Sequence, residues 1–80
     1  MRVAPWTGRA PACIDGAASV RDASRVMHDR GVDELLVTVR HGGAAIPVGF
    51  VSAHDIVTHV VAFGLDAAVL TAGDLLTLRR

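Results

Sequence analysis

Apolar residues recur along the chain with spacings that predict short strands separated by helices. The segment 12–14 predicts a strand, which ends at a turn formed by Asp15 and Gly16. Between Ser19 and Gly31 the apolar residues recur at spacings of three and four, which predicts a helix with one apolar face. That face consists of Val20, Ala23, Val26 and Met27.

The middle of the chain predicts a β-hairpin. Segment 34–40 is a short apolar run rich in β-branched residues, as expected of a buried strand. The turn-forming residues 41–43 follow, and 45–51 supplies the second strand. Pro47 has no amide hydrogen, so it fits this strand only at a sheet edge or at a bulge.

Helix starts are marked by a repeated capping box, in which a hydroxyl and an acid three positions later each accept from a free amide. The pairs are Ser19 with Asp22, Ser52 with Asp55, and Thr71 with Asp74. The second helix therefore begins at Ser52 and ends at Gly64. Segment 65–70 is expected to return in extended form, and a third helix is expected from Thr71 to Arg80.

The order β-α-β-β-α predicts an α+β fold, a small three-stranded sheet with two helices on one face. Strict alternation would place Ile46, Val48 and Phe50 on one face of the last strand and Pro47, Gly49 and Val51 on the other. Both faces then carry apolar residues, so we expect the uncovered face to pair with another surface. Residues 1–11 predict an irregular arm packing through Trp6, and 12–80 one domain.

Length, charge and cysteine content restrict the classes of partner that this protein can have. The chain has 80 residues and a formal net charge of +0, which argues against nucleic acid and anionic membranes as partners. No apolar run approaches the roughly 20 residues of a spanning helix, and the N-terminus lacks the core of a signal peptide, so we expect a cytoplasmic protein. A chain this small needs extra stabilisation, and its single cysteine cannot form an internal disulfide. We therefore expect a homodimer.

The candidate chemistry lies in the segment 49–55, at the end of a strand and the start of a helix. Gly49 allows another group to approach the backbone, and Ser52 presents a hydroxyl where free amides favour a phosphate. Asp55 can accept two hydrogen bonds from a diol such as ribose. The same two side chains also cap the helix, and their spacing alone does not separate capping from binding.

Residues 12–76 resemble a single motif of the CBS-domain (Bateman module) family. The resemblance rests on SVRDASRVM, GVDELLV and GFVSAHDIV. It implies a regulatory, non-catalytic module that senses AMP, ADP, ATP or S-adenosylmethionine, with no cofactor beyond such a ligand. It also implies that Ser52 and Asp55 contact ribose and phosphate, and that Gly49 is the position of close approach.

The adenine pocket that the resemblance implies would contain Ile14 and Leu36. Many family members have Pro where Leu36 stands, and Arg or Lys where His54 stands. Phosphate binding involving His54 would then be weaker, or dependent on pH. A ligand-free pairing module of the same fold is the alternative. The family normally packs two motifs sheet to sheet, so this single motif predicts either a homodimer or a piece of a longer module.

Other chemistry is less favoured by the sequence. His54 and His59 lie about 140° apart around a helix, so we predict no metal site. Cys13 is expected to be a small buried residue, with a nucleophilic Cys–His pair as the alternative, and we predict no catalytic residue. Arginines near the chain ends are expected to be solvated, with a phosphate-contacting arm as the alternative. They are Arg2, Arg9, Arg79 and Arg80.

Overall fold

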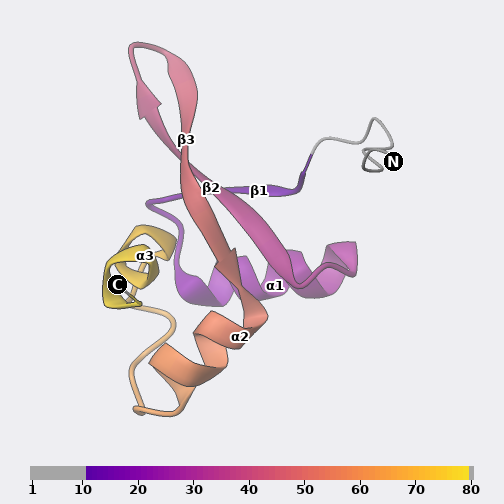
Figure 1. The fold of residues 1–80 in the computed structure, drawn as a ribbon, viewed down its shortest axis with the longest axis vertical. Coiled ribbons are helices and arrows are strands. Elements are labelled where there is room, and N and C mark those ends of the chain that lie inside the picture. Colours follow the sequence, from indigo (N-terminus) through magenta and orange to yellow (C-terminus); the bar gives the residue numbers. More distant parts are fainter. Residues whose placement is uncertain (1–10, 80) are drawn as a thin grey trace, which may run out of the picture.

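The computed structural model describes residues 11–79, so nearly all of the predicted arm, with Trp6, lies outside the described residues. Its three-stranded sheet has the order β1-β2-β3 (Figure 1). β1 (Cys13–Asp15) pairs in parallel with β2 (Glu34–His41), which pairs antiparallel with β3 (Ala44–Ser52). The predicted strands are confirmed, each to within one residue at either end.

A β-bulge interrupts the pairing of β2 with β3. Val37 lies opposite Gly49, whereas its neighbour Thr38 lies opposite Pro47, so Val48 is the extra residue of β3. Pro47 therefore lies beside an irregularity, as its missing amide hydrogen predicted.

The bulge makes the strict alternation predicted for β3 wrong. Ile46 lies opposite Val39, and directly opposite residues of an antiparallel pair share a face. Ile46 is therefore on the face of Val39, whereas Phe50 shares the other face with Leu36. An inserted residue reverses every side chain beyond it, which the hydrophobic pattern does not reveal.

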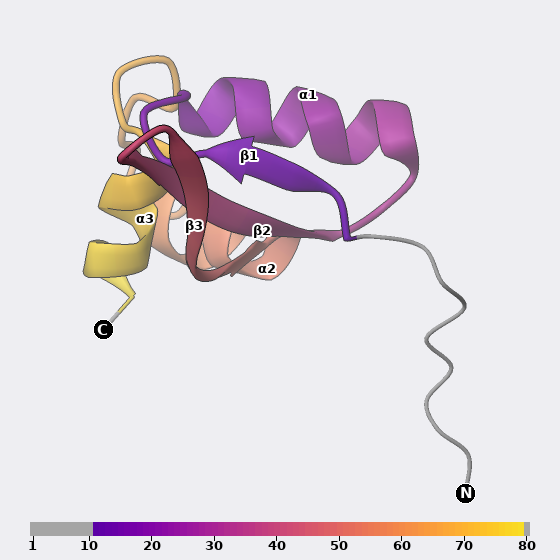
Figure 2. The same cartoon turned by 90° about the horizontal axis from the view of Figure 1, so that it is seen from above.

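The first helix, α1 (Val20–Arg30), begins and ends where the sequence predicts. The Ser19 hydroxyl accepts from the amide of Asp22 at 2.9 Å, which is one half of the predicted capping box. Gly31 ends the helix with φ +66, in the left-handed region that glycine adopts without strain. Figure 2 shows α1 running alongside the sheet.

The second helix is α2 (Ala53–Ile56), which continues as a π-helical turn, η1 (Val57–Val61), and stops before Gly64. Segment 65–70 forms a turn, so the predicted extended return is wrong. The carboxylate of Asp66 accepts from the amide of Ala68 at 2.8 Å and holds the turn. The third helix, α3 (Ala72–Leu78), starts at the predicted capping box.

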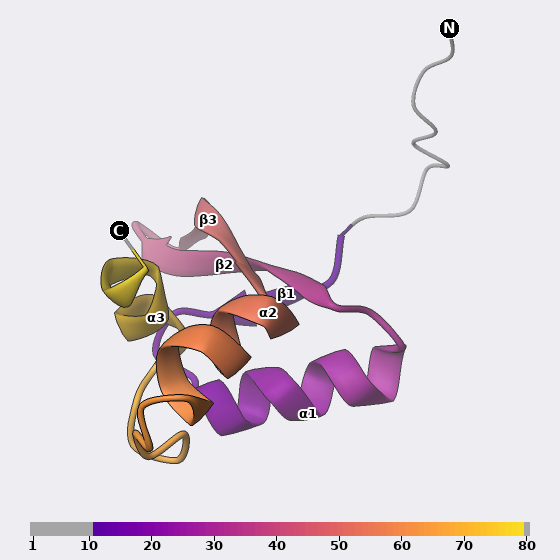
Figure 3. The ribbon, with the colours of Figure 1, turned by 60° about the horizontal axis from the view of Figure 1, so that its bottom comes forward.

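One apolar core joins the helices to one face of the sheet, as predicted (Figure 3). α3 also packs against β1 and β3, and its Ala72 and Leu75 are fully buried. The buried apolar residues are Val20, Ala23, Met27, Leu35, Val37, Val51, Ile56, Val60, Ala72 and Leu75.

The other face of the sheet carries a row of three side chains, Cys13, Leu36 and Phe50, one from each strand. Phe50 is 44% exposed, and Cys13 is exposed as well. The prediction of a buried Cys13 is therefore wrong, because strand alternation turns Ile14 towards the core instead. None of the described helices is long and apolar enough to cross a membrane.

Candidate functional site

The candidate site is built around a complete capping box where β3 passes into α2. The amide of Ser52 donates to Oδ2 of Asp55 at 2.9 Å, and the amide of Asp55 donates to the Ser52 hydroxyl at 3.1 Å. These reciprocal hydrogen bonds fix both side chains on the helix N-terminus. The predicted cap is confirmed.

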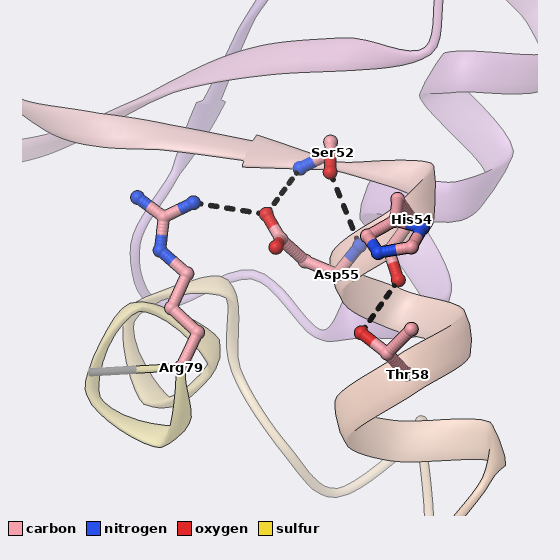
Figure 4. Close-up of polar contacts among 5 residues, drawn as sticks. All are labelled: Ser52, His54, Asp55, Thr58 and Arg79. Carbon is pink, nitrogen blue, oxygen red and sulfur yellow. Dashed lines mark hydrogen bonds and ion pairs between the residues drawn. The ribbon is translucent and has the colours of Figure 1, made fainter.

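A third residue joins this pair from the other end of the chain. Nη1 of Arg79 donates to the same Oδ2 of Asp55 at 2.9 Å, although the two residues are 24 positions apart (Figure 4). The side chain of Asp55 is 15% exposed and that of Arg79 is 33% exposed. Arg79 is exposed, as expected of a solvated arginine, but its guanidinium is also paired with Asp55, which the sequence did not predict. The capping box at 71–74 predicted the helix that carries Arg79 but not where that helix packs.

The pKa of Asp55 reflects two opposing effects. Burial raises the pKa, whereas the hydrogen bonds from Ser52 and the neighbouring Arg79 guanidinium lower it. The lowering effects are larger together, so the pKa lies below the ordinary value of an aspartate. The carboxylate is therefore ionised at neutral pH and available as an acceptor.

Both hydrogen bonds that described residues make to the Asp55 carboxylate end on Oδ2. Oδ1 has no hydrogen bond from any residue between 11 and 79 in the structure. A carboxylate has room for several donors, so Oδ1 is the atom that a ligand hydroxyl would reach.

Gly49 lies earlier on β3 and is approached closely by α3. A Cβ placed on Gly49 would lie 3.0 Å from Cδ2 of Leu76. The sequence predicted that a group approaches the backbone at Gly49, and within this chain that group is the Leu76 side chain.

The remaining candidate residues are more dispersed. His54 is exposed and lies on the other side of Asp55 from Arg79, and its carbonyl accepts from Thr58 (Figure 4). Leu36 is on the open face of the sheet, whereas Ile14 lies opposite Val37 and packs against the core. The structure thus brings Ser52 and Asp55 together but places Ile14 and Leu36 on opposite faces.

Within the described part of the chain, no three His, Cys, Asp or Glu side chains are close enough together to hold a metal ion.

The described residues thus form an α+β unit with a complete capping box at the junction of β3 and α2. The family model of the CBS domain matches residues 7–62, more than half of the chain, so the chain belongs to the CBS domain family. Comparison with curated proteins gives no significant match.

Solved structures of CBS-domain proteins share the fold. A CBS domain protein from Pyrobaculum aerophilum complexed with AMP has a TM-score of 0.72 and 27% identity, over 84% of this chain and 49% of that one. The hexameric CBS-CP12 protein from bloom-forming cyanobacteria has a TM-score of 0.70 and 33% identity, over 82% and 37%. Hypoxic Response Protein I with two coordinated zinc ions has a TM-score of 0.70 and 25% identity, over 80% and 51%. The chain therefore spans about half or less of the length of these proteins.

Proposed function

We propose that this CBS domain is a non-catalytic regulatory module that binds an adenosine-containing ligand, namely AMP, ADP, ATP or S-adenosylmethionine, at the junction of β3 and α2. The observation that carries this proposal is the Asp55 carboxylate, ionised and fixed through Oδ2, with Oδ1 left for a further donor. The AMP complex of the related protein from P. aerophilum supports the ligand class.

Each candidate residue has a distinct part in this proposal. Oδ1 of Asp55 accepts from a ribose hydroxyl, and the Ser52 hydroxyl contacts the phosphate side of the ligand. Gly49 lies beside the site with Leu76 packed on it, so a ligand would reach its backbone only if Leu76 moved, and His54 lies at the rim. For adenine we assign the apolar side chain of Leu36 on the open face of the sheet. Ile14, the other expected pocket residue, lies on the opposite face against the core and would contact adenine only after a rearrangement of β1.

We also propose that the domain acts as a homodimer through the open sheet face. Phe50 is 44% exposed and lies in one row with Leu36 and the exposed Cys13 on this face, and burying such residues against a second copy is favourable. The match covers 49% of the P. aerophilum protein, which leaves room in that protein for a second unit of this size. A ligand would report by changing the dimer equilibrium. Nucleotides are intracellular metabolites, so the proposal places the protein in the cytoplasm.

A ligand-free pairing module is the second candidate, and one observation favours it. The features expected to hold a ligand are partly used within the chain, since Leu76 covers Gly49 and Arg79 contacts Asp55. In this alternative, side chains of α3 and its C-terminal end occupy the positions that a ligand would contact, and the domain functions only by pairing through the open sheet face.

The two candidates are separated by thermal unfolding of the whole chain with AMP, ATP and S-adenosylmethionine, together with molar mass from light scattering. A ligand at 100 times its Kd stabilises by about 2.7 kcal/mol, which moves the midpoint of a small domain by roughly ten degrees or more. We expect such a shift in the native protein and in Asp29→Ala, whose exposed carboxylate lies on α1. Asp55→Ala should abolish it. A dimer without any shift would instead establish the pairing module.

A further inference from the structure

Arg79 has more hydrogen-bonding capacity than the structure uses. A guanidinium is a planar cation with several N–H donors, and the contact with Asp55 engages Nη1. The side chain is 33% exposed, and its other N–H groups make no hydrogen bond to any residue between 11 and 79. The guanidinium is also held in position, because Asp55 is itself fixed by Ser52.

The charge of the proposed site makes this cation important. Asp55 is ionised, so a carboxylate alone beside the ligand would repel a phosphate group. Arg79 is the cation that contacts Asp55 among the residues of the described chain. His54 is exposed and lies on the opposite side of Asp55 (Figure 4). A phosphate that reaches this junction would therefore meet the guanidinium of Arg79 beside the carboxylate.

We propose that Arg79 is a phosphate-binding residue of this site and that it selects phosphorylated adenosine ligands over S-adenosylmethionine. The inference rests on the proposed function, because it names the charge class of the same ligand. AMP carries nearly two negative charges at neutral pH, since the second pKa of a phosphate monoester is about 6. S-adenosylmethionine carries a sulfonium cation on the corresponding part of the molecule, which Arg79 repels.

The geometry also explains why an arginine suits this position. Asp55 takes one edge of the guanidinium, and the planar group can present further donors to phosphate oxygens at the same time. A lysine would offer a single point of charge without that fixed plane. A partly exposed ion pair adds little to folding stability, so removing Arg79 leaves the domain folded for binding measurements.

The test is isothermal titration calorimetry of the full chain with adenosine, AMP and S-adenosylmethionine. We expect Arg79→Gln to weaken AMP binding roughly ten- to hundredfold, while adenosine binding changes by less than about threefold. Arg79→Lys should restore part of the AMP affinity. Arg25→Gln is the matched control, because Arg25 is an exposed arginine on α1 and should leave all three affinities unchanged.

The outcomes separate this inference from the function on which it rests. Equal loss of adenosine and AMP affinity in Arg79→Gln, or no loss of either, would overturn the inference, while binding by the native protein would still support the proposed function. Tighter AMP binding in Arg79→Gln would also overturn it, by showing that Arg79 obstructs the site. If the native protein binds none of the three compounds, the proposed function itself fails, and the inference with it.

Discussion

Cδ2 of Leu76 lies 3.0 Å from the point that a Cβ on Gly49 would occupy. This contact joins β3 to α3, and it depends on the absence of a side chain at residue 49. The backbone of Gly49 also has φ +158, a conformation that side-chain-bearing residues rarely adopt. Gly49 therefore decides how closely α3 packs on the sheet, beside the proposed ligand site.

Gly49→Ala should destabilise the fold because its methyl group would displace Leu76. We expect a loss of about 1–3 kcal/mol in the free energy of unfolding, measured by urea denaturation. Adding Leu76→Ala should recover part of this loss, so that the two changes are not additive.

Gly64→Ala is the control for this prediction. Gly64 has φ +67 with no atom within 4 Å of its Cβ position, so alanine there meets backbone strain but no steric clash. Leu76→Ala should not compensate for Gly64→Ala. Additivity of Gly49→Ala and Leu76→Ala would show that the close contact has no energetic weight.

Removing the Ser52 hydroxyl should affect both stability and ligand binding. Ser52→Ala leaves the Asp55 amide without its acceptor, and we expect a loss of about 1 kcal/mol of stability. Ser19→Ala removes the equivalent bond at the start of α1, at 2.9 Å, and should cost about as much. In the thermal titration only Ser52→Ala should lose nucleotide affinity. Equal affinity in the two variants would restrict Ser52 to capping.

The lowered pKa of Asp55 predicts a dependence of stability on pH. The folded state holds the ionised form more tightly than the unfolded chain does. This stabilisation is fully present above the unfolded-state pKa of about 3.9, and it is lost as the pH falls through the lower folded pKa. Urea denaturation between about pH 2 and pH 6 should show this acid loss in the native protein.

Asp55→Asn should reduce the loss of unfolding free energy at acid pH, because the amide does not ionise. Asp33→Asn, at an exposed position before β2, should leave the profile as in the native protein. If Asp55→Asn loses as much stability at acid pH as the native protein does, the pH dependence comes from other carboxylates.

The local features of this fold could be predicted from the sequence because they depend on neighbouring residues. A hydroxyl and an acid three positions apart satisfy amides of their own helix, so Ser52 with Asp55 marked a helix start correctly. The paired glycines 42 and 43 likewise have positive φ in the hairpin turn.

The features that the sequence did not predict depend on contacts between distant parts of the chain or on one inserted residue. The contact of Arg79 with Asp55 requires α3 to fold back beside β3, and no local pattern specifies that packing. The bulge at Val48 reverses the face of Ile46, although the apolar pattern there is unbroken. Cys13 illustrates a third case, because a strand of three residues carries too little alternation to assign a face.

The open face of the sheet predicts a dimer that depends on Phe50. Phe50→Ser should convert the dimer to a monomer in light scattering, since this side chain is 44% exposed and lies beside Leu36. Phe63→Ser is the matched control, because Phe63 is 72% exposed but follows η1 and belongs to no strand of the sheet. Loss of the dimer in Phe63→Ser but not in Phe50→Ser would move the interface to the helical side.

Cys13 provides an independent reporter of the same interface. Its exposed thiol lies in one row with Leu36 and Phe50, so a second copy on that face would cover it. We expect the thiol of the dimer to react with Ellman's reagent at least roughly tenfold more slowly than the thiol of monomeric Phe50→Ser, because reaction requires dissociation. Dilution of the native protein should accelerate the reaction as the dimer dissociates. A fast reaction that is independent of concentration would show that the sheet face stays open in the dimer, and pairing would then have to involve another surface.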